Sequence, residues 1–328
     1  MAEEKAVSLS SIAESQQIPA KEFEKQYKNH LSNFNNWEQK EHAENWLLFS
    51  ENIGEKLSID EVSVSNGELY TVITNKAGKG GKGSLVTIVK GTKAEEIVHI
   101  LAKIPLSERL TVKEITLDFC PSMAIATRHS FPNAYLVADR FHVQQLVSEA
   151  LQEMRIQERW KAIKEENDNV KEAREQKITY RPKIYSNGDT KKQLLARSRY
   201  LLFKPLNKWT NNQKQRANIL FTEFPELREA YILSINFRSI YEHSQTKKQA
   251  KTMLDKWYSK VEEKGFDPFI TTAEYLKTRE NTILNYFINR STNASAESFN
   301  AKLKGFRALV RGVRDKSFFL FRASRIYG

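Results

Sequence analysis

Cysteine is almost missing from this chain, since Cys120 is the single one among 328 residues. One thiol cannot form an internal disulfide or a cysteine-rich zinc site. No apolar run approaches the roughly 20 residues that a membrane span needs. The N-terminus also lacks the basic and then apolar order of a signal peptide. These absences exclude a disulfide-stabilised secreted domain and a transmembrane protein, and they favour the cytoplasm.

Acidic residues are scarce relative to basic ones in only one half of the chain. Residues 1–150 contain 16 Lys/Arg against 20 Asp/Glu, whereas residues 151–328 contain 36 against 20. The whole chain carries a formal charge of +12. A basic excess confined to one half indicates a surface that faces a polyanion, most often nucleic acid. A generally basic soluble protein is the alternative that charge alone leaves open.

Residues 56–92 carry the clearest strand signal. KLSIDEVSV alternates apolar and polar residues, and ELYTVITNK and SLVTIVKG follow it, with the turn dipeptide Asn66-Gly67 after the first strand. The glycine-rich turn AGKGGKG lacks the spacing of a phosphate-binding loop and lies between antiparallel strands, so it is interpreted as a hairpin loop. A helix over 92–104, capped by Thr92, is predicted next.

Two short apolar runs farther along the chain each end on a carboxylate. A strand over 114–118 ends at Asp118, a helix over 123–130 follows, and a strand over 134–139 ends at Asp139. Parallel strands present such residues at one edge of a sheet, although both aspartates could simply cap helices. Three antiparallel strands, a helix and two further strands are the ribonuclease-H-like order. In it the first strand lies beside the fourth, which makes Asp60 and Asp118 neighbours.

The rest of the chain is predicted to be helical. Residues 143–290 show helical apolar spacing almost throughout. In the last segment, a helix would place Phe299, Leu303, Phe306 and Val310 on one side and Glu297, Asn300 and Lys304 on the other. A carboxylate, an amide and an ammonium, followed by Arg307, Arg311 and Arg314, suit metal and phosphate chemistry. An ordinary surface helix is the alternative.

With these pieces in order, the sequence resembles the catalytic region of DDE transposases from bacterial insertion sequences, in the ISL-three-type group. Three blocks carry the resemblance: LSIDEVSVSNGELYTVITN, LDFCPSMAIATRHSFPNAYLVADRFHV and TNASAESFNAKLKGFRALVRGVRDKSFFLFR. It implies an α/β fold, a ribonuclease-H-like mixed sheet of three antiparallel and then parallel strands, with flanking helices and a large all-helical insertion before the catalytic glutamate. The implied division is a helical N-terminal lead-in (1–55), the first part of the core (56–142), the insertion (143–290) and the C-terminal part of the core with the catalytic helix (291–328).

The resemblance also implies a site. Its catalytic triad would be Asp60, Asp118 and Glu297, holding Mg²⁺ or Mn²⁺, with two ions expected. Asp139 and His142 correspond to a D-x-x-H motif that accompanies the triad; an alternative assignment counts Asp139 in place of Asp60. The residues expected to contact DNA phosphates are Arg140, Asn300, Lys304, Arg307, Arg311 and Arg314.

The implied function is metal-dependent cleavage of transposon ends, followed by attack of the freed 3′-hydroxyl on target DNA. The alternatives are a catalytically inactive DNA-binding derivative and a ribonuclease-H-like nuclease without joining activity. The implied partners are DNA and a second copy of the chain on paired ends. The family usually carries a cysteine-rich zinc-binding module and a helix-turn-helix, which we expect on a separate polypeptide unless this is a truncated or repurposed copy. The implied location is the bacterial cytoplasm, on the nucleoid.

Overall fold

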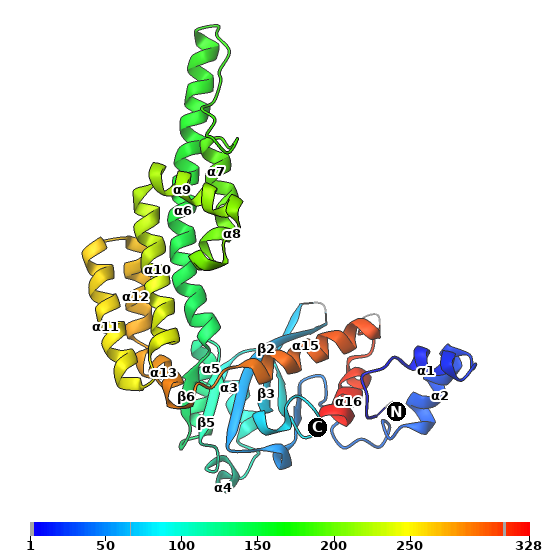
Figure 1. The fold of residues 1–328 in the computed structure, drawn as a ribbon. Helices are drawn as coiled ribbons and strands as arrows, with labels where there is room; N and C mark the ends of the chain where they lie inside the picture. Colours follow the sequence, from blue (N-terminus) through cyan, green and yellow to red (C-terminus); the bar gives the residue numbers. More distant parts are fainter. Residues whose placement is uncertain (1–2, 66, 311–312) are drawn as a thin grey trace. The chain divides into compact units, whose positions relative to one another are not determined.

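The computed structural model describes residues 3–65, 67–310 and 313–328. It divides into two compact units, which Figure 1 shows as a sheet with flanking helices and a helical assembly. Met1–Asp139 and Asn289–Gly328 form the first, called the core unit below, and Arg140–Ile288 form the second, called the helical unit. No helix within the described ranges is long and apolar enough to cross a membrane.

The sheet of the core unit has the strand order β1-β4-β3-β2-β5-β6 within the described residues. The strands are β1 Trp46–Leu48, β2 Lys56–Ser65, β3 Glu68–Asn75, β4 Leu85–Lys90, β5 Glu114–Leu117 and β6 Tyr135–Ala138. Neighbours from β1 to β2 pair antiparallel, whereas β2–β5 and β5–β6 pair parallel. The predicted mixed sheet is therefore confirmed, with the first predicted strand, β2, beside the fourth, β5.

Strand β2 is buried on both faces because its apolar residues change sides along its length. Leu57 and Ile59 pack on the face covered by α3 (Ala94–Leu101) and α5 (Pro121–Ser130). Val62 and Val64 pack on the opposite face with α15 (Ala294–Leu309) and α16 (Lys316–Tyr327). Since side chains alternate along a strand, Asp60 shares the α15 face with Val62 and Val64.

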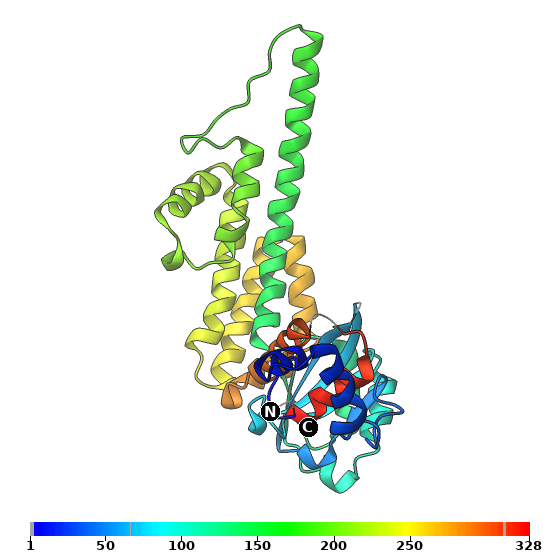
Figure 2. The ribbon, with the colours of Figure 1, turned by 90° about the vertical axis from the view of Figure 1, so that its right-hand side faces the viewer.

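The N-terminal region differs from its prediction. The region forms two short helices, α1 (Leu9–Ser15) and α2 (Ala20–Gln26), and a π-helical turn (Tyr27–Leu31), which lie near α16 (Figure 2). Tyr27 and Phe34 pack with Phe318 and Phe321 of α16. The region was expected to be helical throughout, but β1 joins the sheet edge beside β4. Three apolar residues among scattered aromatics are too short a signal to identify such a strand.

The helix predicted to begin at Thr92 also begins later. In the structure α3 starts at Ala94, and its N-cap, Lys93, makes no side-chain capping bond. Gly91, with φ 86°, still bridges to Tyr70 of β3. This bridge keeps the backbone in the sheet and delays the helix; the short helix α4 (Leu106–Arg109) follows.

The helical unit is built around the 36-residue helix α6. Its helices are α6 Arg140–Glu175, α7 Lys191–Arg197, α8 Arg199–Leu202, α9 Asn211–Glu223, α10 Pro225–His243, α11 Lys247–Lys264, α12 Asp267–Lys277, α13 Glu280–Leu284 and α14 Tyr286–Asn289. Helices α10 and α12 both pack on α6, and α11 packs on both of them (Figure 1). The buried Trp257 indole anchors α11 by donating to the Leu233 carbonyl at 2.9 Å.

Candidate active site

Three aspartates lie at the same level of three adjacent parallel strands. Ile59, Leu117 and Ala138 are the last positions at which β2 pairs with β5 and β5 pairs with β6, and β2 itself continues to Ser65. Asp60, Asp118 and Asp139 are the next residues, and the Asp139 N–H donates to the Leu117 carbonyl at 2.9 Å. Because neighbouring strands are about 4.8 Å apart, these carboxylates lie side by side. We call this set the acidic edge.

Asn293, the N-cap residue of α15, joins two members of the acidic edge. Its backbone N–H donates to Asp139 Oδ2 at 2.9 Å, and its Nδ2 donates to Asp118 Oδ1 at 3.2 Å. The same Nδ2 lies 3.4 Å from the carbonyl of Ile59. Asn293 is fully buried. The start of α15 is thereby fixed against Ile59 within β2 and against the residues that follow β5 and β6. The sequence analysis did not foresee this, and the only signal was this asparagine in the third quoted block.

Asn300 holds the remaining aspartate. Its Nδ2 donates to Asp60 Oδ2 at 2.7 Å and to the Glu61 carbonyl at 3.2 Å. The sequence placed Asn300 on the polar side of the helix with Glu297 and Lys304, but it is only 5% exposed whereas those two are exposed. Its side chain faces the sheet because Asp60 offers an acceptor there. Burial and the Asp60 charge together raise the pKa of Glu61.

Glu297 lies one helical turn after Asn293. Its N–H donates to the Asn293 carbonyl at 3.0 Å, and helical spacing places it on the side of α15 that includes Asn293 and Asn300. Its side chain is exposed. Within the ranges that the structure describes, no group of three or more His, Cys, Asp or Glu is arranged to hold a metal ion. Asp60, Asp118 and Glu297 thus share a region without converging on one point.

The chemical character of this region nevertheless fits a hard divalent cation. Mg²⁺ and related ions prefer carboxylate and amide oxygens. The Oδ1 atoms of Asn293 and Asn300 are buried and have no hydrogen-bond partner among the described residues. Together with the neighbouring carboxylates they form an oxygen-rich donor set.

The other end of β5 carries a second carboxylate, Glu114, which is fully buried. The Lys76 ammonium lies 3.0 Å from its Oε1, and the Tyr135 hydroxyl donates to its Oε2 at 2.8 Å. The side chains of Ser291 and Asn289 also donate to it. Burial opposes ionisation, but the hydrogen bonds from Ser291, Asn289 and Lys76 outweigh it and hold the pKa of Glu114 at about 2.

One segment contacts both ends of β5. Within residues 289–293, which we call the strap, Asn289 and Ser291 donate to Glu114 and Asn293 donates to Asp118. Sequence reasoning missed this segment. The alternation of Asn, Ser and Asn at every second position was the available signal, but it is also common in polar loops.

The other predicted site residues have varied surroundings. Arg307 donates to the carbonyls of Ser63 and Val64 on β2, at 3.1 and 3.4 Å. Lys304 and Arg314 are exposed. Arg311 lies outside the described residues. The structure therefore gives Arg307 a partner within the sheet and leaves the charged groups of Lys304 and Arg314 accessible to solvent.

Arg140 and His142 belong to the helical unit, at the start of α6. The Arg140 guanidinium lies over the Tyr241 ring, 5.3 Å from its centroid, and 3.8 Å from the Glu242 carboxylate. His142 is half-buried, and its ring stands edge-on to Phe141. Both positions follow Asp139 directly along the chain.

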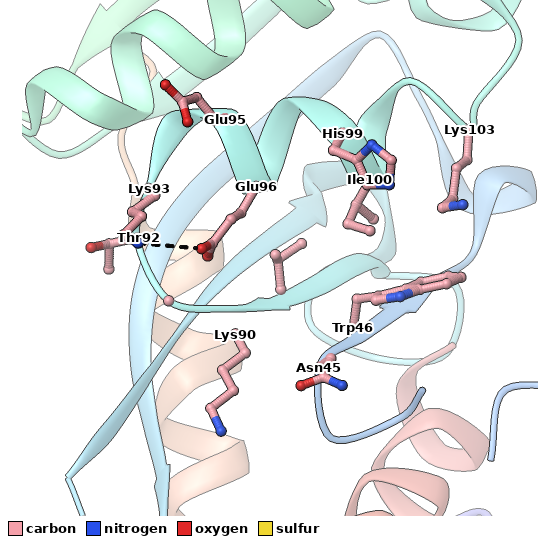
Figure 3. A pocket seen from close by; sticks show the side chains of 12 residues that line it. Asn45, Trp46, Lys90, Thr92, Lys93, Glu95, Glu96, His99, Ile100 and Lys103 are labelled. Atoms are coloured by element: carbon pink, nitrogen blue, oxygen red, sulfur yellow. Dashed lines mark ion pairs between the residues drawn. The ribbon is translucent and has the colours of Figure 1, made fainter. Parts of the chain in front are cut away.

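A separate hollow of about 880 Å³ lies beside β1 and α3 of the core unit (Figure 3). Trp46 forms one wall, with the Lys103 ammonium 5.1 Å from its ring centroid. Lys93 and Glu96 form an ion pair of 3.7 Å at the opposite side. None of the predicted site residues lines this hollow, so it is not the acidic edge.

The chain matches the family model of ISL-three-type DDE transposases, described as a transposase family, over residues 57–323. The matched range includes the acidic edge, the helical unit, the strap and α15. No curated protein and no solved structure matches the chain significantly.

Proposed function

Because the chain belongs to the ISL-three-type family of DDE transposases, we propose that its acidic edge is the site at which transposon DNA is cut and joined. One observation carries this proposal. Asp60, Asp118 and Asp139 each follow a residue of one paired row across the parallel strands, and the helix that bears Glu297, together with its N-cap residue Asn293, is hydrogen-bonded to all three. The alternative that the aspartates only cap the helices that follow them does not explain these contacts, because the two asparagines that make the contacts lie on another segment.

The burial of the aspartates supports a division of roles. Asp60 and Asp118 are half-buried, whereas Asp139 is 3% exposed. We therefore assign Asp60, Asp118 and Glu297 as metal ligands. Asp139 accepts the backbone N–H of Asn293 and so positions the helix that carries Glu297. His142 is assigned to the same supporting role or to the scissile phosphate.

When bound, Mg²⁺ or Mn²⁺ ions would activate an attacking oxygen and stabilise the leaving oxygen of a phosphodiester. The amides of Asn293 and Asn300 hold the Asp118 and Asp60 carboxylates in fixed orientations, which reduces the reorganisation that binding requires. Exposed Lys304 and Arg314 would contact DNA phosphates without reading bases. Water first hydrolyses the bond at the transposon end, and the freed 3′-hydroxyl then attacks target DNA.

Two partners complete the proposal. Transposition joins two ends, so we expect a second copy of the chain on paired ends. The charged groups described above contact phosphates, which carry no sequence information. Recognition of the end sequence needs further contacts to base edges, which a zinc-binding or helix-turn-helix polypeptide could supply as the second partner.

The test is nicking of a duplex that carries the terminal inverted repeat. We expect cleavage by the purified chain with Mg²⁺ or Mn²⁺, no cleavage in EDTA, and loss of cleavage in Asp118→Ala. Glu95→Gln is the control, because it changes an exposed carboxylate of α3 in the core unit that lines the separate hollow beside β1. Metal-independent binding without cleavage would support the inactive derivative, and cleavage without joining of a pre-nicked end would support a simple nuclease.

A further inference from the structure

A groove of about 800 Å³ runs along one face of α6 in the helical unit. Phe141, Gln152, Arg155, Arg159 and Trp160 line it from α6, at positions that helical spacing places on one side. Its other wall comes from α8, the residue after it and α10, which contribute Arg199, Phe203 and Arg238. Three elements far apart in sequence therefore build a single concave surface.

The groove has a strong excess of positive charge. Four arginines line it against one carboxylate, Glu149, which already accepts a hydrogen bond from Gln145 at 2.7 Å. Within the described residues, none of these four arginines is paired with a carboxylate. An uncompensated cluster of guanidinium groups on a concave surface attracts a polyanion, and phosphate fits guanidinium geometry well.

The positive charges of the groove lie close together, and Arg155 is affected most clearly. It is 5% exposed, and its guanidinium donates to Gln152 Oε1 at 2.7 Å and to the Leu195 carbonyl at 2.9 Å, both neutral groups. Burial, and then the charges of Arg159 and Arg199, lower its pKa. A buried cation near two others is costly, and an anion in the groove would offset that cost.

Large aromatic rings are exposed in the same groove. Phe141 and Trp160 are each 65% exposed, and they lie 19 positions apart on α6, about 28 Å along the helix axis. Exposed aromatic faces beside arginines are the arrangement on which unpaired bases stack. The hollow beside β1 differs, because there Lys93 is paired with Glu96 and Glu95 adds another acidic charge (Figure 3).

We propose that this groove binds single-stranded DNA, with phosphates against Arg159 and Arg199 and a base stacked on Trp160. The proposal rests on the transposase function proposed above and adds the binding surface and the strand state of the DNA. Phe141, at the groove's first turn, lies two residues after Asp139 along the chain, within about 8 Å of backbone. The groove therefore begins directly after the acidic edge along the chain.

The experiment measures binding of the full chain to a labelled dT20 strand and to a duplex of equal length, by fluorescence anisotropy in EDTA. We expect tighter binding of the single strand, about tenfold weaker binding by Trp160→Ala, and near-native binding by Trp160→Phe. Arg159→Ala should lower the slope of log Kd against log salt by about one. Arg174→Ala removes the same charge from α6 outside the groove and should leave the affinity unchanged.

Two results would overturn the groove assignment. One is unchanged affinity in Trp160→Ala, and the other is an equal loss in Arg174→Ala, which would indicate non-specific charge. Both substituted side chains are exposed, and circular dichroism would verify their folding. Because EDTA prevents cleavage, this readout is separate from the nicking test. A wild-type chain that binds DNA in the groove but never cleaves would refute the catalytic proposal alone.

Discussion

Strand β5 carries a carboxylate at each end, and the two have different surroundings. Glu114 is fully buried, paired with the Lys76 ammonium and bonded by the strap. Asp118 is half-buried, bonded by the Asn293 amide, and flanked by Asp60 and Asp139 in the next strands. One strand, one sheet face and one covering segment thus support two kinds of acidic residue. The difference is consistent with the proposal that Glu114 anchors the strap through its paired charge and that the clustered aspartates belong to the active site.

The largest expected difference between the two ends of β5 is the effect of their substitution on the rate of nicking. We expect Asp118→Asn to lower the rate of metal-dependent nicking by at least about 1,000-fold, because several kcal/mol of charge stabilisation would be lost. Glu114→Gln, which keeps the shape and some hydrogen bonds, should retain most of the rate at a temperature where it is folded. Single-turnover cleavage of an inverted-repeat duplex measures both. Equal losses in the two variants would show that the ends of β5 do not differ in role.

The free energy of unfolding should depend strongly on Glu114, the end of β5 whose substitution is expected to affect activity least. Glu114→Ala leaves Lys76 without its buried partner, and breaking such a pair costs about 3–5 kcal/mol of unfolding free energy. Glu55→Ala is the matched control, since its pair with Lys113 is exposed on both sides and should contribute less than about 1 kcal/mol. Urea unfolding measures both values. If the two variants lost equal stability, the buried pair would not anchor the strap.

Much of this core could be predicted from sequence because its signals are local. Alternating apolar residues, a turn dipeptide and two apolar runs ending in aspartate predicted the order of the elements, and the ribonuclease-H-like topology typical of that order placed β2 beside β5, and with them Asp60 beside Asp118. Strand β1 was not predicted, because three residues carry too little periodicity. The burial of Asn300 was not foreseen, because an amide is polar in sequence but can be buried once a carboxylate faces it.

Contacts between distant segments were not predictable in the same way. Glu114 resembles any exposed glutamate at a strand end, and only the fold brings Lys76 and the strap to it. The groove on α6 depends on arginines from three elements, whereas the sequence showed merely basic stretches. Asn293 was visible in the third quoted block, yet nothing in that block indicates which carboxylates it contacts. Partners of buried polar groups therefore need the tertiary structure.

The pH dependence of the unfolding free energy is an independent measure of how much ionised Glu114 stabilises the fold, and the expected effect is smaller. The pKa of Glu114 is about 2 in the folded chain against an ordinary value of 4.5. Its stabilising contribution is therefore complete above about pH 4.5 and is lost as the pH falls toward 2, by roughly 3 kcal/mol in total. Glu114→Gln lacks this titration, so its stability should fall less than that of the wild type between pH 6 and pH 3. Parallel curves from urea unfolding would contradict the assignment.

The smallest expected effect is the change in stability when the strap loses a single hydroxyl, that of Ser291. Ser291→Ala removes one hydrogen bond to the ionised Glu114, and bonds to charged groups contribute about 1.5–3 kcal/mol. We expect a loss near the lower end of that range, because Lys76, Tyr135 and Asn289 still satisfy the carboxylate. Ser317→Ala, which removes an exposed hydroxyl of the core unit, serves as the control and should change stability little. Nicking by Ser291→Ala should keep its wild-type rate, because Asn293 continues to fix α15 on Asp118 and Asp139. A strong loss of nicking with unchanged stability would instead place Ser291 in the catalytic machinery and remove the distinction between the two ends of β5.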